Sequence, residues 1–413
     1  MDDAARSGIR VGRPLAGVRV LAIEQFVAGP YGSMLLADAG AEVIKIEQPG
    51  QGEEYRREGP PLPDLPAPLN GSYFWRLNRG KRSVTLDLSQ PAGRELFLGL
   101  VRQSDVVWEN LKAGSLERLG LDYPTLRAAN PAIIYLTITG FGHEDVLPSP
   151  FSDRPAFDII AQSLAGILDL IGEVDGPPLW PQVSTGDIFP GLMAAFALTL
   201  ALRARDRDGR GRRVDLSLYD ALLSLNERNM FTYGLTGEIP RRGKLTSTAP
   251  YGTFRAKDGY VVIATLGQRV WLRFCAAIGR PDLPDDPRLA RGILRARHLD
   301  DVLRPLIEQW LADKTPAEAV AHFLAHGVPA AEVQNAADVF RCPHVAARHM
   351  LIPLQSERVG PLRVVGNPIK VAGEEEGPAT APPDLGADNA RVLGELLHLD
   401  AAQIAGLHDR GVI

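Results

Sequence analysis

Asp187 lies directly before a long apolar stretch, in the segment Val183-Ser-Thr-Gly-Asp-Ile-Phe-Pro-Gly-Leu192. An Asp in front of an apolar helix most often caps the helix, accepting hydrogen bonds from its first backbone N–H groups. The same position keeps a carboxylate ionised and provides amide donors nearby. An ionised carboxylate can also act as a nucleophile and carry an acyl group. From the residues alone, the cap is the commoner role.

A second candidate is the run Asn78-Arg-Gly-Lys-Arg-Ser83, which places three cations beside a backbone turn. Arg and Lys side chains are the usual donors to phosphate oxygens. A solvated turn before the predicted strand 83–88 explains the same residues equally well. Both interpretations stay open at this point.

Other kinds of site find little support in the sequence. His322 and His326 have helical i,i+4 spacing but no acidic or Cys partner to complete a metal site, so we predict none. Gly140-Phe-Gly142 lacks the third glycine and the helix start of a dinucleotide fingerprint. No Gly-x-Ser-x-Gly occurs, which argues against a serine hydrolase elbow.

The elements that must position these residues alternate between strand and helix in the first half of the chain. Val- and Ile-rich runs predict strands, and segments of helical periodicity lie between them. The strands are 18–23, 42–46, 105–108 and 133–138, and the helices are 31–39, 91–102 and 115–129. This alternation predicts an α/β fold with a parallel, doubly wound sheet, which binds ligands beyond the carboxyl ends of its strands. Val27-Ala-Gly-Pro30 and Thr139-Gly-Phe-Gly142 follow two such ends.

Six segments in a shared order resemble the family III coenzyme A transferases, which include the α-methylacyl-CoA racemases. They are Leu15–Leu21, Val27–Pro30, Leu35–Glu47, Leu77–Ser83, Glu109–Gly120 and Thr139–Gly142. The resemblance implies that Asp187, in a Gly-Asp-x-x-x-Gly motif, is the nucleophile of a thioester exchange. An acyl-CoA donor and a small carboxylic acid acceptor are then the substrates, with coenzyme A as part of a substrate and no permanently bound cofactor.

The resemblance also assigns roles to other residues. Backbone amides near Gly140 and Gly186 are the candidate donors to the tetrahedral oxyanions. The residues implied to bind coenzyme A are Val27, Ala28, Arg79, Lys81, Arg82, Asn110 and Arg118. Arg118 suits a surface helix cation as well as a cofactor contact.

Phe157 distinguishes the two chemistries of the family. The racemases have a His-Asp pair where this chain has Phe157-Asp158. Racemisation needs a base and an acid on opposite faces of the α-carbon, and a phenyl ring is neither. The sequence therefore favours transfer; a racemase or epimerase and a non-catalytic acyl-CoA-binding paralogue remain alternatives.

Three departures from the formyl-CoA:oxalate member argue against oxalate as a substrate. Val27 replaces a glutamine, Gln48 replaces an arginine, and Lys244–Ala249 replaces a run of glycines.

The family resemblance implies a Rossmann-like large domain made from both chain ends, with a smaller α+β domain inserted between. A predicted hairpin at 251–264, with its turn at Lys257-Asp-Gly259, belongs to the smaller domain. The predicted boundaries are 1–205 for the large domain, 206–236 for a linker, 237–328 for the small domain, 329–383 for a linker and 384–413 for the returning helices.

The resemblance further implies an interlocked homodimer. Four apolar residues of the connectors are expected to need a partner chain to cover them, namely Phe231, Tyr233, Ile352 and Leu354.

Composition is that of an ordinary soluble protein, with 45% hydrophobic and 23% charged residues in 413. A net charge of −5 gives no reason to expect a nucleic-acid partner or an anionic membrane surface. Two cysteines cannot form a disulfide framework, and the N-terminus has no signal-peptide pattern, so we expect a cytoplasmic protein. The longest apolar run, 188–202, is short for a membrane helix and predicts a buried one.

Overall fold

A six-stranded parallel sheet organises the N-terminal half of the chain in the computed structural model, which describes residues 12–62, 64–243, 247–354, 356, 359–372, 376 and 380–413. The strand order is β3-β2-β1-β4-β5-β6. The strands are β1 (Arg19–Ile23), β2 (Glu42–Glu47), β3 (Arg82–Thr85), β4 (Val106–Glu109), β5 (Ile134–Thr139) and β6 (Arg212–Ser217). The predictions of an α/β class and of a parallel sheet are confirmed.

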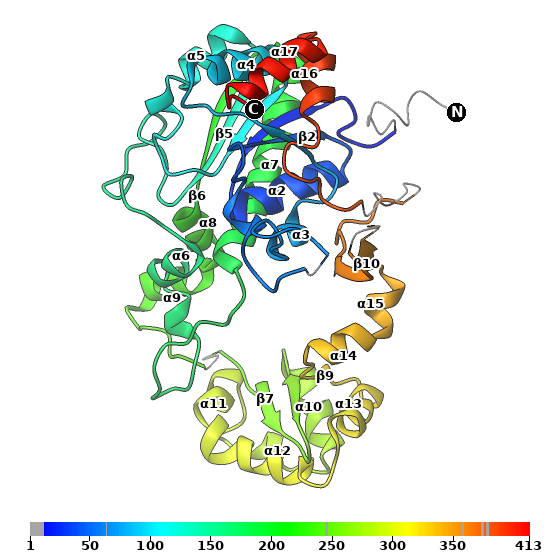
Figure 1. Cartoon of the computed structure of the whole chain (residues 1–413). Helices are drawn as coiled ribbons and strands as arrows, with labels where there is room; N and C mark the ends of the chain where they lie inside the picture. Colours follow the sequence, from blue (N-terminus) through cyan, green and yellow to red (C-terminus); the bar gives the residue numbers. More distant parts are fainter. Residues whose placement is uncertain are drawn as a thin grey trace. The chain divides into compact units, whose positions relative to one another are not determined.

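Alternation along the strands explains why helices cover both faces of this sheet. Val20 and Ala22 of β1 belong to one apolar core, whereas Leu21 and Ile23 belong to the other, since successive side chains point to opposite faces. The first core contains α2 (Ala28–Asp38), α7 (Thr185–Asp208) and α8 (Leu218–Leu225). The second contains α4 (Pro91–Arg102), α5 (Tyr123–Ala129), α16 (Asn389–Leu397) and α17 (Ala401–Asp409) (Figure 1).

The chain divides into two compact units. Unit 1 comprises residues 1–167, 182–226 and 346–413, and unit 2 comprises 168–181 and 227–345. The chain's C-terminal helices therefore share a unit with its first strands. Asp388 and Asn389 accept the N–H groups of Ser83 and Thr85 at the open edge of β3, at 2.9 and 2.8 Å.

Two segments predicted as linkers contain structure. Residues 206–236 include β6, which pairs with β5 over six residues and so belongs to the sheet. The sequence predicts a strand at 213–218, one residue from the observed bounds, so the error lies in assigning this strand to a linker. Residues 329–383 include the hairpin of β10 (Leu351–Leu354) and β11 (Leu362–Val365). Leu354 is buried and Ile352 packs against the cluster around Phe74, so these two need no partner chain, unlike the exposed Phe231 and Tyr233.

Unit 2 contains the predicted hairpin as β7 (Tyr251–Arg255) and β8 (Tyr260–Ala264). The short strand β9 (Ala330–Glu332) adds to β8, and the sheet packs against an apolar core. Its principal helices are α9 (Glu227–Thr236), α10 (Gln268–Ala277), α12 (Arg304–Leu311), α13 (Pro316–Ala325) and α14 (Ala336–Arg341). Of the Lys244–Ala249 run, residues 244–246 lie outside the described part of the chain.

Helix α7 is 24 residues long and, in the described residues, is the one helix that length and composition would allow to cross a membrane. Ala194, Leu198 and Leu202 bury one side of it in the core beneath the sheet. These contacts make α7 a core helix of unit 1.

Candidate active site

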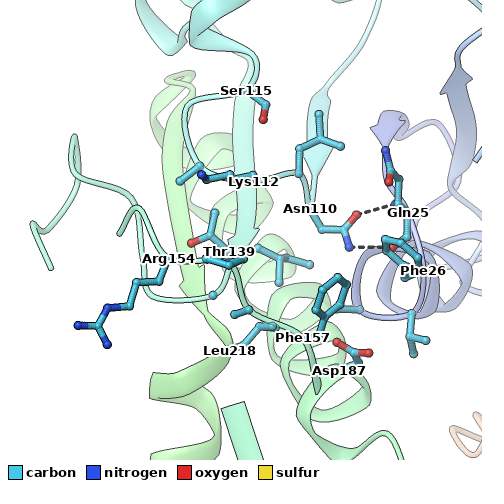
Figure 2. Close-up of a pocket in the computed structure, with 18 of the residues that line it drawn as sticks. Gln25, Phe26, Asn110, Lys112, Ser115, Thr139, Arg154, Phe157, Asp187 and Leu218 are labelled. Carbon is cyan, nitrogen blue, oxygen red and sulfur yellow. Dashed lines mark hydrogen bonds between the residues drawn. The ribbon is translucent and has the colours of Figure 1, made fainter. Parts of the chain in front are cut away.

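A cavity of about 350 Å³ opens at the carboxyl ends of β1, β4 and β5, entirely within unit 1. Parallel strands end at the same edge of a sheet, so the loops that follow them meet there. The residues that line it are Gln25, Phe26, Val27, Ala28, Asn110, Leu111, Lys112, Ala113, Ser115, Ile138, Thr139, Gly140, Ser152, Arg154, Pro155, Ala156, Phe157, Asp187 and Leu218 (Figure 2). Val27, Ala28, Asn110, Gly140 and Asp187 of the predicted site are thus brought together.

Asp187 is the third residue of α7 and is not its cap, because the helix begins at Thr185 and Ser184 occupies the N-cap position. Among the described residues, no hydrogen bond or ion pair engages its carboxylate. Burial, and secondarily the negative charge of Asp158, raises the pKa of Asp187 to about 7. Figure 2 shows the carboxylate beside the ring of Phe157 at one end of the cavity. The group is therefore unpaired and open to a ligand.

Gly186 has a different role from the one predicted. Its N–H donates to Asp158 Oδ1 at 2.7 Å, so this amide is not open to an oxyanion. A Cβ at Gly186 would lie 2.5 Å from the Asp158 carbonyl oxygen, which explains why a glycine stands here. Both Asp158 oxygens also accept from Gln162 Nε2 at 2.9 Å. Asp158 thus joins α6 (Asp158–Leu164) to the first turn of α7.

Gly140 lines the cavity just after β5. Its carbonyl accepts from the Tyr219 N–H and from Ser217 Oγ, both at 3.2 Å. A Cβ there would lie 2.4 Å from Ala156 Cβ, so the tight approach of the 154–157 loop requires glycine. Its amide remains the predicted oxyanion donor.

Asn110 fixes the loop that follows β1. Its Oδ1 accepts from the Gln25 N–H at 2.8 Å and its Nδ2 donates to the Gln25 carbonyl at 2.9 Å (Figure 2). The side-chain amide thus hydrogen-bonds to both the N–H and the carbonyl of Gln25, in the way that two paired residues of neighbouring strands do. Asn110 is therefore a positioning residue for the cavity wall.

Helices α2 and α7 approach closely enough to need glycine at their contact. A Cβ at Gly191 would lie 2.5 Å from the Ala28 carbonyl, and one at Gly32 would lie 2.6 Å from the Gly191 carbonyl. Trp108 Nε1 donates to the Gly29 carbonyl at 3.2 Å. This contact explains the second glycine of the Gly-Asp-x-x-x-Gly motif and holds the N-termini of both helices at the cavity.

The three cations of the 78–83 segment do not line the cavity, which corrects their predicted placement. Arg79 pairs with Asp38 at 2.6 Å, Lys81 with Glu24 at 2.7 Å and Arg82 with Glu42 at 2.6 Å. All three side chains are buried. The structure gives them intramolecular partners and lends no support to a phosphate-binding role.

Lys81 lies within a larger buried network that the sequence did not suggest. Its Nζ also donates to the Pro30 carbonyl at 3.0 Å and to Asn78 Oδ1 at 2.9 Å. Burial lowers the pKa of Lys81 to about 8 against the attraction of Glu24. Burial alone would raise the pKa of Glu24, but Lys81 and Lys45 together hold it below its usual value. The network ties the start of α2 to the sheet.

Two cations that sequence reasoning missed do line the cavity, Lys112 and Arg154. Lys112 lies two residues beyond Asn110, so its place after a strand end was a usable signal. Arg154 lies in a loop, stacked 3.8 Å over Phe151, and had no comparable signal. Arg118 is exposed, does not line the cavity, and donates to Ser115 Oγ, which does, at 3.0 Å.

The chain is similar to known proteins over most of its length. The model of CoA-transferase family III matches residues 15–389. A succinyl-CoA:mesaconate CoA-transferase of Haloarcula hispanica is 40% identical over 384 residues, covering 92% of this chain and 96% of its own. A succinyl-CoA–D-citramalate CoA-transferase of Chloroflexus aurantiacus is 34% identical, covering 98% and 100%.

Among solved structures, a CaiB/BaiF family protein of Brucella suis is similar to this chain, with a TM-score of 0.81 and 34% identity. The match covers 93% of this chain and 99% of that one. The residues matched by the family model include the sheet, the cavity and Asp187. The chain belongs to CoA-transferase family III.

Proposed function

We propose that this protein is an acyl-CoA:carboxylate CoA-transferase in which Asp187 is the nucleophile. The observation that carries the proposal is the unpaired carboxylate at the third position of α7, facing a cavity built at the carboxyl ends of the sheet. A carboxylate engaged in an ion pair would have to lose its partner before reacting. Asp187 needs no such step.

The proposed exchange proceeds through two covalent forms of Asp187. A carboxylate oxygen of Asp187 attacks the thioester carbonyl, the C–S bond breaks, and coenzyme A departs as the thiolate. Asp187 then carries the acyl group as a mixed anhydride. The thiolate then attacks the aspartyl carbonyl and displaces the donor acid, leaving an aspartyl-CoA thioester. The acceptor carboxylate then attacks the aspartyl-CoA thioester, which releases the thiolate and forms a second mixed anhydride. The thiolate attacks the acceptor's carbonyl in this anhydride, which gives the new acyl-CoA and restores Asp187. No net proton transfer occurs, and each intermediate keeps the activation of the thioester, so no ATP is required.

Other residues of the cavity would hold the substrates. We assign the Gly140 amide to the tetrahedral oxyanions, alone rather than with Gly186. Lys112 and Arg154 line the cavity and Arg118 bonds to its rim, which makes these cations the better candidates for coenzyme A phosphates. Val27, Ala28 and Asn110 would form the wall along the cofactor.

The names of the relatives suggest succinyl-CoA as donor and a short dicarboxylic acid as acceptor. The test is to incubate the purified protein with succinyl-CoA and a panel of acids and to identify products by mass spectrometry. We expect a new acyl-CoA and free succinate in equal amounts, only when an acid is present. Hydrolysis without transfer, or no reaction with any acid, would contradict the proposal.

The racemase alternative is less well supported because Phe157 lines the cavity where the resemblance places the histidine of the racemases, and a phenyl ring is neither an acid nor a base. A 2-methylacyl-CoA in deuterated water should therefore show no enzyme-dependent exchange at its α-carbon. Rapid exchange would favour racemisation. The non-catalytic alternative is also less well supported, because a protein that only binds acyl-CoA does not require the unpaired carboxylate of Asp187 in the cavity.

We also propose a homodimer, interlocked as in the family. An apolar surface on α6, α7 and α8 of unit 1 supports it, since its side chains are exposed in the single chain: Ile159, Ile160, Leu164, Leu192, Phe196, Leu200, Leu223 and Leu225. Covering such a surface is favourable by about 25 cal/mol per Å². Light scattering should give the mass of two chains at micromolar concentration. An active monomer would contradict the proposal.

A further inference from the structure

Four aromatic rings follow one another at the Asp187 end of the cavity. Phe157 meets Phe26 edge to face at 5.8 Å between centroids, Phe26 meets Tyr55 at 5.5 Å, and Tyr55 meets Tyr73 at 5.4 Å. Only the first two line the cavity. Tyr55 packs against Phe26 and Tyr73 packs against Tyr55, so the exposed ring of Phe157 contacts a neighbour that is itself supported.

Phe26 is held in a backbone conformation that bulky residues avoid, with φ at +61°. Three hydrogen bonds maintain it. Its own N–H donates to Glu53 Oε2 at 3.1 Å, and Asn110 fixes both backbone groups of the preceding Gln25. Backbone strain of this kind persists where the surroundings over-determine it, and it gathers at functional sites. The strain here places one particular ring against Phe157.

Phe157 is 58% exposed and stands beside the reactive carboxylate (Figure 2). Any acyl group bonded to Asp187 would extend from that carboxylate into space bordered by this ring. A phenyl ring has no donor or acceptor for a hydroxyl group, which would lose its hydrogen bonds to water there. A planar, unsaturated chain would stack on the ring instead.

We propose, on the basis of the proposed function, that Phe157, braced by Phe26, selects the carbon chain of the transferred acyl group. The favoured class is acids with a double bond or apolar branch next to the reacting carboxyl group, over acids with a hydroxyl group at the same carbons. Phe157 is thus a specificity-determining residue, and Phe26 is its positioning residue.

The test uses acids that share a skeleton. Mesaconate, methylsuccinate and citramalate are five-carbon dicarboxylic acids with a double bond, a saturated bond and a hydroxyl group at the same carbons. Crotonate, butyrate and 3-hydroxybutyrate form the corresponding monocarboxylate set. With succinyl-CoA as donor, kcat/KM of the wild type for the unsaturated acid should exceed that for the hydroxylated acid by at least about tenfold.

The wild type should also prefer the unsaturated to the saturated acid, because a planar chain stacks on the ring, and replacing the ring should reduce this second preference. We expect Phe157→Leu to lower the unsaturated-to-saturated ratio at least about threefold, and Phe26→Leu to act in the same direction. Phe157→Tyr keeps the ring and should retain the ratio. Phe340→Leu is the matched control, since Phe340 is 54% exposed and does not line the cavity. Circular dichroism and acyl-CoA binding would verify that each variant folds.

Two results would overturn the inference alone: transfer by the wild type with no preference within an acid set, or an unchanged ratio in Phe157→Leu. Refusal of both sets, with transfer to other acids of a wider panel, would also overturn it and leave the proposed function standing. Absence of transfer to any acid would overturn the proposed function itself.

Discussion

The basic segment 78–83 and the carboxylate Asp187 have opposite fates in this molecule. The segment has three cations in four residues, and each meets a carboxylate from elsewhere in the chain and is buried. Asp187 resembles an ordinary helix cap but keeps an unpaired carboxylate in a cavity. The density of charge in a sequence therefore says less about ligand binding than whether counter-charges reach it.

The sheet explains the difference. Strand β3 lies beside β2, and β2 beside β1, so Glu42 and Glu24 come close to the basic segment. The charge that acts on Asp187 is that of another carboxylate, Asp158, which raises the pKa of Asp187 further instead of pairing with it. One region balances its charge within the chain, and the other leaves it for a substrate.

The largest effect should come from removing the unpaired charge. We expect Asp187→Ala to reduce transfer at least about 10³-fold, because the variant loses the carboxylate that carries the acyl intermediate. Coenzyme A binding, measured by calorimetry, should persist. Asp206→Asn, at an exposed position of the same helix, is the control and should be fully active. Near-normal activity of Asp187→Ala would exclude the covalent mechanism.

A pair of lysine substitutions compares the two regions directly. Lys81→Met should lower the free energy of unfolding by up to about 3–5 kcal/mol, because buried Glu24 loses its nearer cation at 2.7 Å and keeps only Lys45, at 3.5 Å. Lys112→Met, in the cavity wall, should leave stability nearly unchanged and raise KM for acyl-CoA. Denaturant unfolding and steady-state kinetics separate the two. If Lys81→Met instead raised KM for acyl-CoA and left stability unchanged, the basic segment would again be the candidate phosphate site.

The pH dependence should report the environment of Asp187. Only the ionised carboxylate is a nucleophile, and its pKa is raised to about 7, so kcat/KM should fall tenfold per pH unit below about 7 and level off above it. Asp158→Asn keeps an acceptor for the Gly186 N–H but removes the charge, so the midpoint should move to lower pH. A wild-type midpoint below about pH 5 would be close to the pKa of an ordinary Asp, about 3.9, and would contradict a desolvated carboxylate.

The smallest effect concerns Arg118. An exposed cation contributes up to about 1 kcal/mol, so Arg118→Ala should raise KM for acyl-CoA by no more than about fivefold and leave kcat unchanged. Arg127→Ala, exposed on α5, should change neither constant. A loss of kcat in Arg118→Ala would point to a role closer to the reaction.

The strands were predictable because their apolar, β-branched runs are local signals; β2 and β5 lie within one residue of the predicted ends, and α4 matches fully. The cavity followed from the topology, since loops after β1, β4 and β5 must meet. The partners of Arg79 and Lys81 were not predictable, because Asp38 and Glu24 lie more than 40 positions away in the chain. The engagement of the Gly186 amide was not predictable for the same reason, because its N–H donates to Asp158 from another helix.

The most direct test of the central claim is to isolate the covalent intermediate. The wild type would be incubated with succinyl-CoA without acceptor, treated with hydroxylamine or borohydride, digested, and mapped by mass spectrometry. The account predicts modification of Asp187 in the wild type, dependent on succinyl-CoA, and no modification at that position in Asp187→Ala. Active enzyme with an unmodified Asp187, or with the label on another residue, would contradict it.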